Sequence, residues 1–161
     1  MFNTFVYFAI LLGCCLYTVL RGSAPERIGA AILLLGSILT LVTLSSVATI
    51  YRSLEVGVFL VDVATLAAFV VLALRADRLW PLCITAFQLV GTAGHAVKLV
   101  DPQVLPYAYA FALRFWGYPM ILMLIIGTWN HQRRLARNGV DRSWSTSSGR
   151  WDRRRPGGPI S

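Results

Sequence analysis

The sequence has few charged residues for its length. Asp, Glu, Lys and Arg make up 14% of its 161 residues, whereas a soluble domain carries roughly 25%. The apolar residues, 57% of the chain, occur in long blocks rather than in amphipathic stripes. This composition excludes an ordinary soluble domain and indicates a chain that folds in lipid.

Cysteine and histidine are also scarce. The number and spacing of Cys14, Cys15 and Cys83 predict neither a disulfide framework nor a zinc site, and we expect all three to pack as small apolar side chains. His95 and His131 are expected on opposite sides of the membrane, which disfavours a paired-histidine haem or metal site. No phosphate-binding glycine loop, nucleophile elbow, HExxH or CxxC motif occurs. We therefore expect no metal, no cofactor and no enzymatic activity.

Five apolar blocks are long enough to cross a hydrocarbon core about 30 Å thick, which takes roughly 20 helical residues. They cover residues 2–20, 28–50, 54–74, 80–100 and 104–129. The linkers between them are short, so each helix should run antiparallel to the next. The sequence predicts an all-α, polytopic membrane helix bundle with five transmembrane helices in residues 1–130.

Prolines and tryptophans mark the expected ends of these helices. Pro25 should precede the second helix, and Pro81 suits the first turn of the fourth, where a missing N–H costs nothing. Trp80 and Trp129 are expected at one membrane face, because amphipathic rings prefer the interface. Pro119 lies inside the fifth block and predicts a kink there, since it removes a helical hydrogen bond.

The basic residues predict an orientation. Residues 131–161 carry eight arginines and two aspartates, and residues 1–130 carry seven basic and five acidic residues. Cytoplasmic segments of membrane proteins are enriched in Lys and Arg, so we expect an N-out/C-in, multi-pass protein of the cell inner (plasma) membrane. Residues 131–161 then form a basic cytoplasmic tail. The tail should be mostly disordered because it is polar and rich in Gly and Pro, although residues 131–137 should extend the fifth helix.

The first apolar block has two alternative interpretations. It could be a cleaved signal peptide, or Leu11-Leu12-Gly13-Cys14 could be a lipoprotein cleavage box. Both would require basic residues ahead of the apolar block, and Met-Phe-Asn has none. Both would also export the basic tail. We therefore expect the first helix to be retained.

Four ionisable residues fall well inside the predicted helices: Asp62, His95, Lys98 and Arg114. At roughly 1.5 Å per residue, Asp62 and Arg114 should lie about 12 and 15 Å deep, and His95 and Lys98 about 8 and 3 Å. All four are expected in the outer half of the bilayer. Ionisable residues inside a membrane are costly and usually face the bundle interior, so these four form the candidate polar pocket or ion pair.

Two arrangements of these residues are open. Asp62 and Arg114 have opposite charges at similar depth, so they could form an ion pair that fixes helix register or floors a pocket. On the fourth helix, Gln88, His95 and Lys98 share one face. That face could contact another helix or form a proton-linked or anion-binding site, and Gly91 and Gly94 could let another backbone approach closely. At the inner membrane face, the only carboxylate that we consider as a candidate site residue is Asp77, which has arginines as its neighbours in the sequence.

The arginines of the tail are candidate contacts for anionic lipid headgroups, each worth about 1 kcal/mol near the surface; they are Arg133, Arg134, Arg137, Arg153, Arg154 and Arg155. The expected partners are the bilayer, anionic lipids at the cytoplasmic face, and a second copy or another membrane protein. Because the basic character is confined to the tail, no nucleic-acid partner is expected.

The sequence thus predicts a small integral membrane protein that acts as a non-enzymatic accessory or binding component, with a polar pocket or partner contact in the outer half of the bilayer. One alternative is an oligomeric small-solute or proton-coupled transporter. Another is a membrane enzyme with a site facing the periplasm. A transporter would have a water-accessible cavity at Asp62. A binding component would have a filled core and an exposed stripe of small residues, and an enzyme would have a groove where two titratable groups meet.

Overall fold

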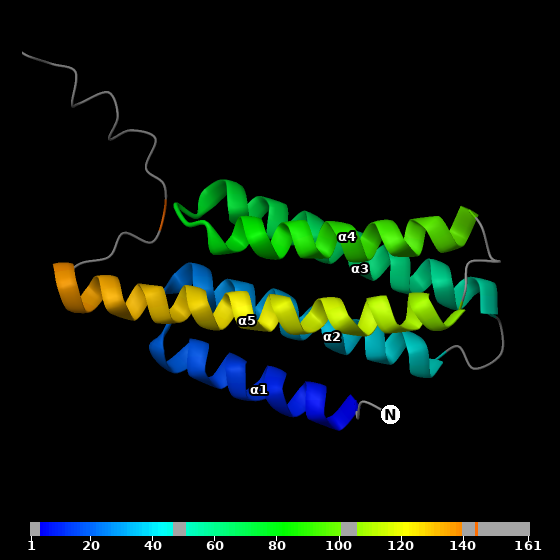
Figure 1. The fold of residues 1–161 in the computed structure, drawn as a ribbon, viewed down its shortest axis with the longest axis horizontal. Coiled ribbons are helices and arrows are strands. Elements are labelled where there is room, and N and C mark those ends of the chain that lie inside the picture. The colour runs from blue at the N-terminus through cyan, green and yellow to red at the C-terminus, as the bar shows by residue number, and fades with distance from the viewer. Residues whose placement is uncertain (1–3, 47–50, 101–105, 140–143, 145–161) are drawn as a thin grey trace, which may run out of the picture.

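The structure, a computed structural model, describes residues 4–46, 51–100, 106–139 and 144, and the side chains within these ranges except those of 44–46, 51–55, 97–100 and 106–114. Five α-helices make up this part of the chain (Figure 1). They are α1 (Thr4–Arg21), α2 (Ala24–Ser46), α3 (Tyr51–Arg75), α4 (Trp80–Val100) and α5 (Pro106–Asn138). The predicted all-helical fold is confirmed.

The observed helices match the apolar blocks, with informative differences at their ends. The second helix begins at Ala24 rather than at residue 28, so Pro25 lies in its first turn instead of preceding it. The third begins at Tyr51, which makes Asp62 the twelfth of its 25 residues. Asp62 is therefore close to the middle of α3, eleven residues from its start instead of the eight predicted. The predicted extension over residues 131–137 is confirmed, because α5 continues to Asn138.

The helices form a ring. Each one packs against its neighbours in the order α1, α2, α3, α4 and α5, and α5 returns to contact α1. A smaller contact between α2 and α5 crosses the ring. Figure 1 shows the five helices lying alongside one another with their long axes close to parallel, and α5 extending past the others at its C-terminal end.

Three helices in the described part of the chain are long and apolar enough to cross a membrane: α1, α2 over Ala24–Thr43 and α3 over Val56–Arg75. Only about a fifth of the residues in these stretches are buried inside the protein. Large apolar side chains therefore cover the outside, among them Phe5, Leu39 and Leu74, which are 83%, 52% and 75% exposed. Such a surface suits lipid and not water, so these helices indicate a transmembrane protein.

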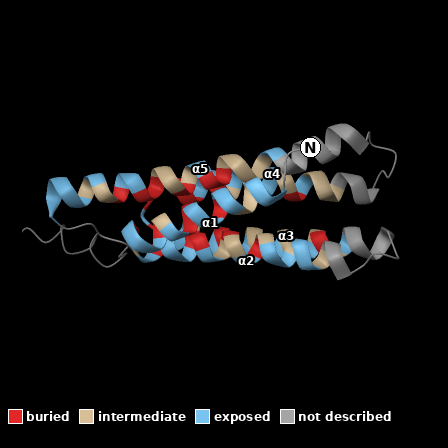
Figure 2. Ribbon diagram, turned by 90° about the horizontal axis from the view of Figure 1, so that it is seen from below, coloured by how far each residue is buried: buried red, intermediate tan, exposed pale blue. Residues whose placement is uncertain are grey.

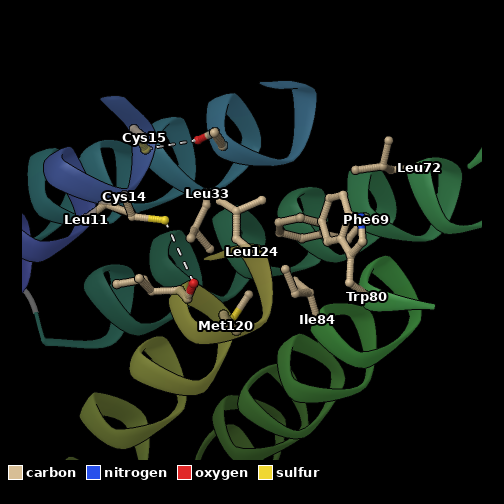
Figure 3. Close-up of a cluster of buried hydrophobic side chains, with 12 residues drawn as sticks. Leu11, Cys14, Cys15, Leu33, Phe69, Leu72, Trp80, Ile84, Met120 and Leu124 are labelled. Carbon is tan, nitrogen blue, oxygen red and sulfur yellow. Dashed lines mark hydrogen bonds between the residues drawn. The ribbon is translucent and has the colours of Figure 1, made fainter. Parts of the chain in front are cut away.

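The buried core lies along the axis of the ring, where Figure 2 shows the buried residues gathering. It combines leucines, isoleucine and aromatic rings from all five helices, including Leu11, Leu33, Phe69, Ile84 and Leu124 (Figure 3). The thiols of Cys14 and Cys15 point from α1 to the carbonyl oxygens of Ile121 and Ala30, at 3.8 and 3.7 Å. These two cysteines are small buried residues, while Cys83 is exposed.

Trp80 is a central part of this packing. A Cβ atom built on Gly29 of α2 would lie 2.6 Å from the Trp80 ring, and one built on Gly127 of α5 would lie 2.7 Å from it. Trp80 is only 6% exposed, so its ring packs inside the bundle and not on the outer surface. It is instead held between two helices that approach closely only because both positions are glycine. Trp129, which is 53% exposed, keeps an outward position.

α5 is one continuous helix from Pro106 to Asn138. Pro119 lies inside the helix, and the helix passes through it without a break. At the other end, Gly139 adopts a φ of 69°, and its N–H donates to the carbonyl of Leu135 at 2.9 Å. Helices commonly end at a glycine in the left-handed conformation. The conformation of Gly139 therefore ends α5.

Replacing Gly127 with alanine tests the packing of Trp80. The added methyl group would meet the indole ring, so we expect Gly127→Ala to lower the free energy of unfolding by about 1–3 kcal/mol, as overpacked cores do. Gly13→Ala is the matched control, because a Cβ at Gly13 on α1 meets no described atom within 4 Å. Unfolding in mild detergent by titration with a denaturing detergent would measure both; equal stability of the two variants would contradict the close packing.

Candidate functional site

Asp62 on α3 and His95 on α4 face each other inside the bundle. The imidazole Nε2 of His95 lies 3.0 Å from the carboxylate Oδ2 of Asp62. Gln88, two helical turns before His95, donates from Nε2 to the other carboxylate oxygen and to the Asp62 carbonyl, each at 3.3 Å. α3 and α4 are the most extensively packed pair of helices, so these three residues form one polar site, which we call the α3–α4 site.

The α3–α4 site is neither fully sealed nor fully open. The side chains of His95 and Asp62 are 12% and 19% exposed, so a small group can reach them while most of their surface is held by the helices. Both oxygens of the Asp62 carboxylate have a partner, which lowers the cost of keeping a charge at this depth. The pair brings a carboxylate and an imidazole within hydrogen-bond distance of each other. No cluster of three metal-ligating residues occurs in the described part of the chain.

The other two predicted members of the pocket cannot be placed. The side chains of Lys98 and Arg114 fall outside the described residues. The predicted Asp62–Arg114 ion pair therefore stays a prediction, while the carboxylate that would form it already contacts His95 and Gln88. The interpretation of Gln88 and His95 as residues that hydrogen-bond to a neighbouring helix agrees with these contacts.

The glycines of α4 do not behave as expected within the described structure. A Cβ atom built on Gly91 or Gly94 would meet no described atom within 4 Å. The close backbone approach predicted at these two positions is therefore not seen among the described residues. Close approaches are seen at other glycines, among them Gly29 and Gly127, both against Trp80.

Three of the six candidate lipid-contact arginines are described. Arg133 and Arg137 are exposed and Arg134 is half-buried, all on the last two turns of α5. The Arg133 guanidinium lies over the Trp129 ring at 4.7 Å from its centre, a cation–π arrangement. Arg153, Arg154 and Arg155 lie outside the described residues, as does most of the tail whose disorder was predicted.

A second polar cluster, which the sequence analysis missed, lies where α1 passes into α2 and α3 into α4. Glu26 is fully buried. Its Oε1 accepts a hydrogen bond from the Trp80 indole at 3.1 Å and lies 3.5 Å from Nε of Arg78, whose side chain is 1% exposed. Its Oε2 accepts from the backbone N–H of Ser23 at 3.1 Å and from the Ser23 hydroxyl. We call these four residues the Glu26 cluster.

The Glu26 cluster is formed by two local features of the chain, the start of α2 and the turn between α3 and α4. Ser23 precedes the first residue of α2 and Glu26 is the third, so the Glu26 carboxylate binds back to the Ser23 N–H as in a capping box. Arg78 and Trp80 come from the turn between α3 and α4 and from the start of α4. The cluster therefore joins two hairpins that are far apart in sequence, and a buried charge is balanced by an opposite one.

The sequence contained a signal for this cluster. Ser23-Ala24-Pro25-Glu26 is a Ser-x-x-Glu pattern with a proline in the first turn, which marks a helix start. The prediction that Asp77 is the only candidate carboxylate at this end is wrong. Glu26 belongs to the first turn of α2 and not to the linker before it. Asp77 is exposed and Glu26 is buried. The contact with Trp80, 54 residues away, had no local signal.

Polar contacts also join α1 to α5 at the Glu26 end of the bundle. The hydroxyls of Thr18 and Thr128, both fully buried, lie 3.3 Å apart. One turn further on, the Gln132 amide donates to the carbonyl of Arg21, which is the last residue of α1. These contacts satisfy backbone and hydroxyl groups that would otherwise be costly in an apolar surrounding.

Comparison with known proteins gives no relationship. No protein-family model matches the chain, and neither a characterised protein nor a solved structure does.

Substituting Glu26 tests the charge balance of its cluster. Glu26→Gln removes the carboxylate charge that lies beside the buried Arg78, so we expect a loss of about 3–5 kcal/mol of stability. Asp77→Asn removes an exposed carboxylate three residues before Trp80 and should change stability by less than about 0.5 kcal/mol. Both would be measured by unfolding in mild detergent.

A double variant separates the ion pair from general damage. Glu26→Gln combined with Arg78→Met removes both charges, so its loss of stability should be smaller than the sum of the two single losses. Additive losses, or a Glu26→Gln variant as stable as Asp77→Asn, would contradict the buried ion pair.

Proposed function

We propose that this chain is a five-span, multi-pass protein of the cell inner membrane, with the N-terminus outside and the C-terminal tail in the cytoplasm. Three helices are apolar and long enough to span. α4 has 21 residues, about 31 Å of helix, and packs between α3 and α5. A helix of this length that packs along the lipid-spanning α3 fits a fourth span. α5 completes the ring against α1.

The arginines support the orientation. Arg21, Arg27, Arg75 and Arg78 all lie at the Glu26 end of the bundle, which is also where α5 leads into the basic tail. Placing this end in the cytoplasm satisfies the enrichment of basic residues on the inner side. It also leaves the α3–α4 site nearer to the outer side than the Glu26 cluster is.

Cysteine labelling in intact cells tests this topology. In a variant without its three native cysteines, Thr4→Cys on α1 should react with a membrane-impermeant maleimide. Asp77→Cys, also exposed, should react only after the inner membrane is permeabilised. The reverse pattern would contradict the orientation, and a mature protein without Thr4 would contradict the five-span model.

Within this topology we propose that the protein is a non-enzymatic accessory or binding component, with the α3–α4 site as its binding site. The observation that supports this is the 3.0 Å contact between His95 and Asp62, with both side chains partly exposed within apolar helices. The filled core around Leu11, Phe69 and Leu124 also agrees with a binding component. A charged partner group or a polar solute would find an acceptor, a donor and an amide here.

The same contact favours a proton-coupled transporter as the second candidate. Carboxylates and imidazoles inside membrane helices mark proton relays in pumps and transporters. A membrane enzyme is expected to have a groove in which two titratable groups meet. The contact supplies the two titratable groups within hydrogen-bond reach. A cavity between α2 and α3 lies away from Asp62, so it lends no support to transport or catalysis there.

Photo-cross-linking in native membranes tests the binding role. A cross-linking residue at Leu89, which follows Gln88 and is 56% exposed, should give a discrete adduct that Asp62→Asn reduces at least about tenfold, the loss of a charge-assisted contact. Leu12 on α1, 54% exposed, is the matched control. Equal adducts at both positions, or an adduct unaffected by Asp62→Asn, would contradict the binding role. Proton flux into liposomes that requires Asp62 would favour transport.

A further inference from the structure

The surface between α2 and α3 is hollowed next to the basic end of the bundle. The cavity has a volume of about 410 Å³ and is lined almost entirely by apolar side chains, among them Ile28 and Ile32 of α2 and Ala67, Val71 and Leu72 of α3. This volume falls within the range of about 300–1,000 Å³ found for ligand sites. Its walls include Ile28 and Val71, which are 41% and 48% exposed, so the hollow opens sideways to the surroundings of the helices.

One end of this groove is cationic and aromatic. Arg75, the last residue of α3, lines it together with Trp144. From Ala67 to Arg75 the groove follows α3 over eight residues, which is about 12 Å. Trp144 is 38% exposed, and an amphipathic indole ring suits the depth of lipid headgroups. The groove thus has an apolar channel with a positive charge and an aromatic ring at its mouth.

We propose that the α2–α3 groove binds one anionic phospholipid, with an acyl chain along Ile32, Ala67 and Val71 and the phosphate at Arg75. This inference rests on the proposed membrane location of the chain. Water would find no polar partners along the apolar walls, whereas an acyl chain is supplied by the bilayer itself. The site is separate from the tail arginines, because it lies on the helices and has a defined shape.

Charge selects this occupant over a second copy of the chain. Arg21 and Arg27 are exposed at the same end as Arg75, so another copy that met the groove at this end would bring further positive charge to it. An anionic headgroup is attracted to the same set of charges. The groove therefore complements a molecule with an apolar chain and a negative head.

Native mass spectrometry of the detergent-purified protein would test the site, with phosphatidylglycerol and phosphatidylcholine as probes. The wild-type chain should retain one phosphatidylglycerol in preference to phosphatidylcholine. Arg75→Gln should lower that preference about fivefold, as expected for one cation near a headgroup, and Arg75→Lys should restore it. Arg21→Gln, at an exposed arginine on α1 that does not line the groove, is the matched control and should lower the preference less than Arg75→Gln does.

A groove-filling variant tests the acyl chain. Ala67→Trp places a large side chain on an exposed lining position, so retention of both lipids should fall at least about tenfold, which corresponds to displacing two apolar carbon groups from the groove. Ala86→Trp makes the same change at an exposed alanine of α4 and should retain the lipid.

Two results would overturn the lipid site. One is equal retention of both lipids by the wild-type chain and by Arg75→Gln. The other is a dimer that Ala67→Trp disrupts, because it would assign the groove to a second copy. Both readouts are made on the purified protein, so they are independent of the cysteine labelling that tests topology and of the cross-linking that tests the α3–α4 site.

Discussion

Glu26 is fully buried where α1 passes into α2, and its carboxylate is held by Ser23, Trp80 and Arg78. A buried carboxylate that loses its partners costs several kcal/mol, so the surrounding chain has to deliver them. Ser23 comes from the turn beside it, and Arg78 and Trp80 come from the next hairpin along the chain. The position of α4 relative to α2 follows from this requirement. Trp80 then fixes the distance to α5 through Gly127.

The two polar clusters differ in how they are enclosed. The Glu26 cluster has side chains that are 0% and 1% exposed, and all its partners come from the chain itself. Asp62 and His95 are 19% and 12% exposed, and the Gln88 amide binds to Asp62. A sealed cluster serves packing, because nothing outside can reach it. A partly open one retains surface for an outside group, which is why the proposed binding role is assigned to the α3–α4 site.

Much of the fold could be predicted from the sequence, because long apolar blocks and short linkers leave few alternatives. The five helices and the extension of α5 to Asn138 follow from these patterns. The start of α2 was misplaced because Ser23-Ala24-Pro25-Glu26 was considered a linker rather than a helix cap. The inward position of Trp80 could not be predicted, since it depends on Gly127, which is distant in sequence and provides the space for its ring.

The candidate site was predicted in part, for a physical reason. Asp62 and His95 were identified because ionisable residues are rare and costly inside a span. The partner of Asp62 was chosen by charge and depth, which pointed to Arg114. Depth does not determine which side of α3 faces α4. Apolar side chains such as Leu60, Val63 and Val70 are exposed around Asp62, so the pattern of α3 gives no direction, and the contact with His95 follows only from the packing of the two helices.

The closure of the helix ring has a consequence for synthesis. Cys14, Thr18 and Arg21 of α1 make their contacts with Ile121, Thr128 and Gln132 of α5, across separations of 107, 110 and 111 residues. Because α1 precedes α5 in the chain, the side of α1 that faces α5 is covered only after α5 has been synthesised. During that interval α1 has α2 as its neighbour and keeps a polar stripe open to the lipid. In a chain that ends before α5, the side of α1 that faces α5 therefore stays uncovered.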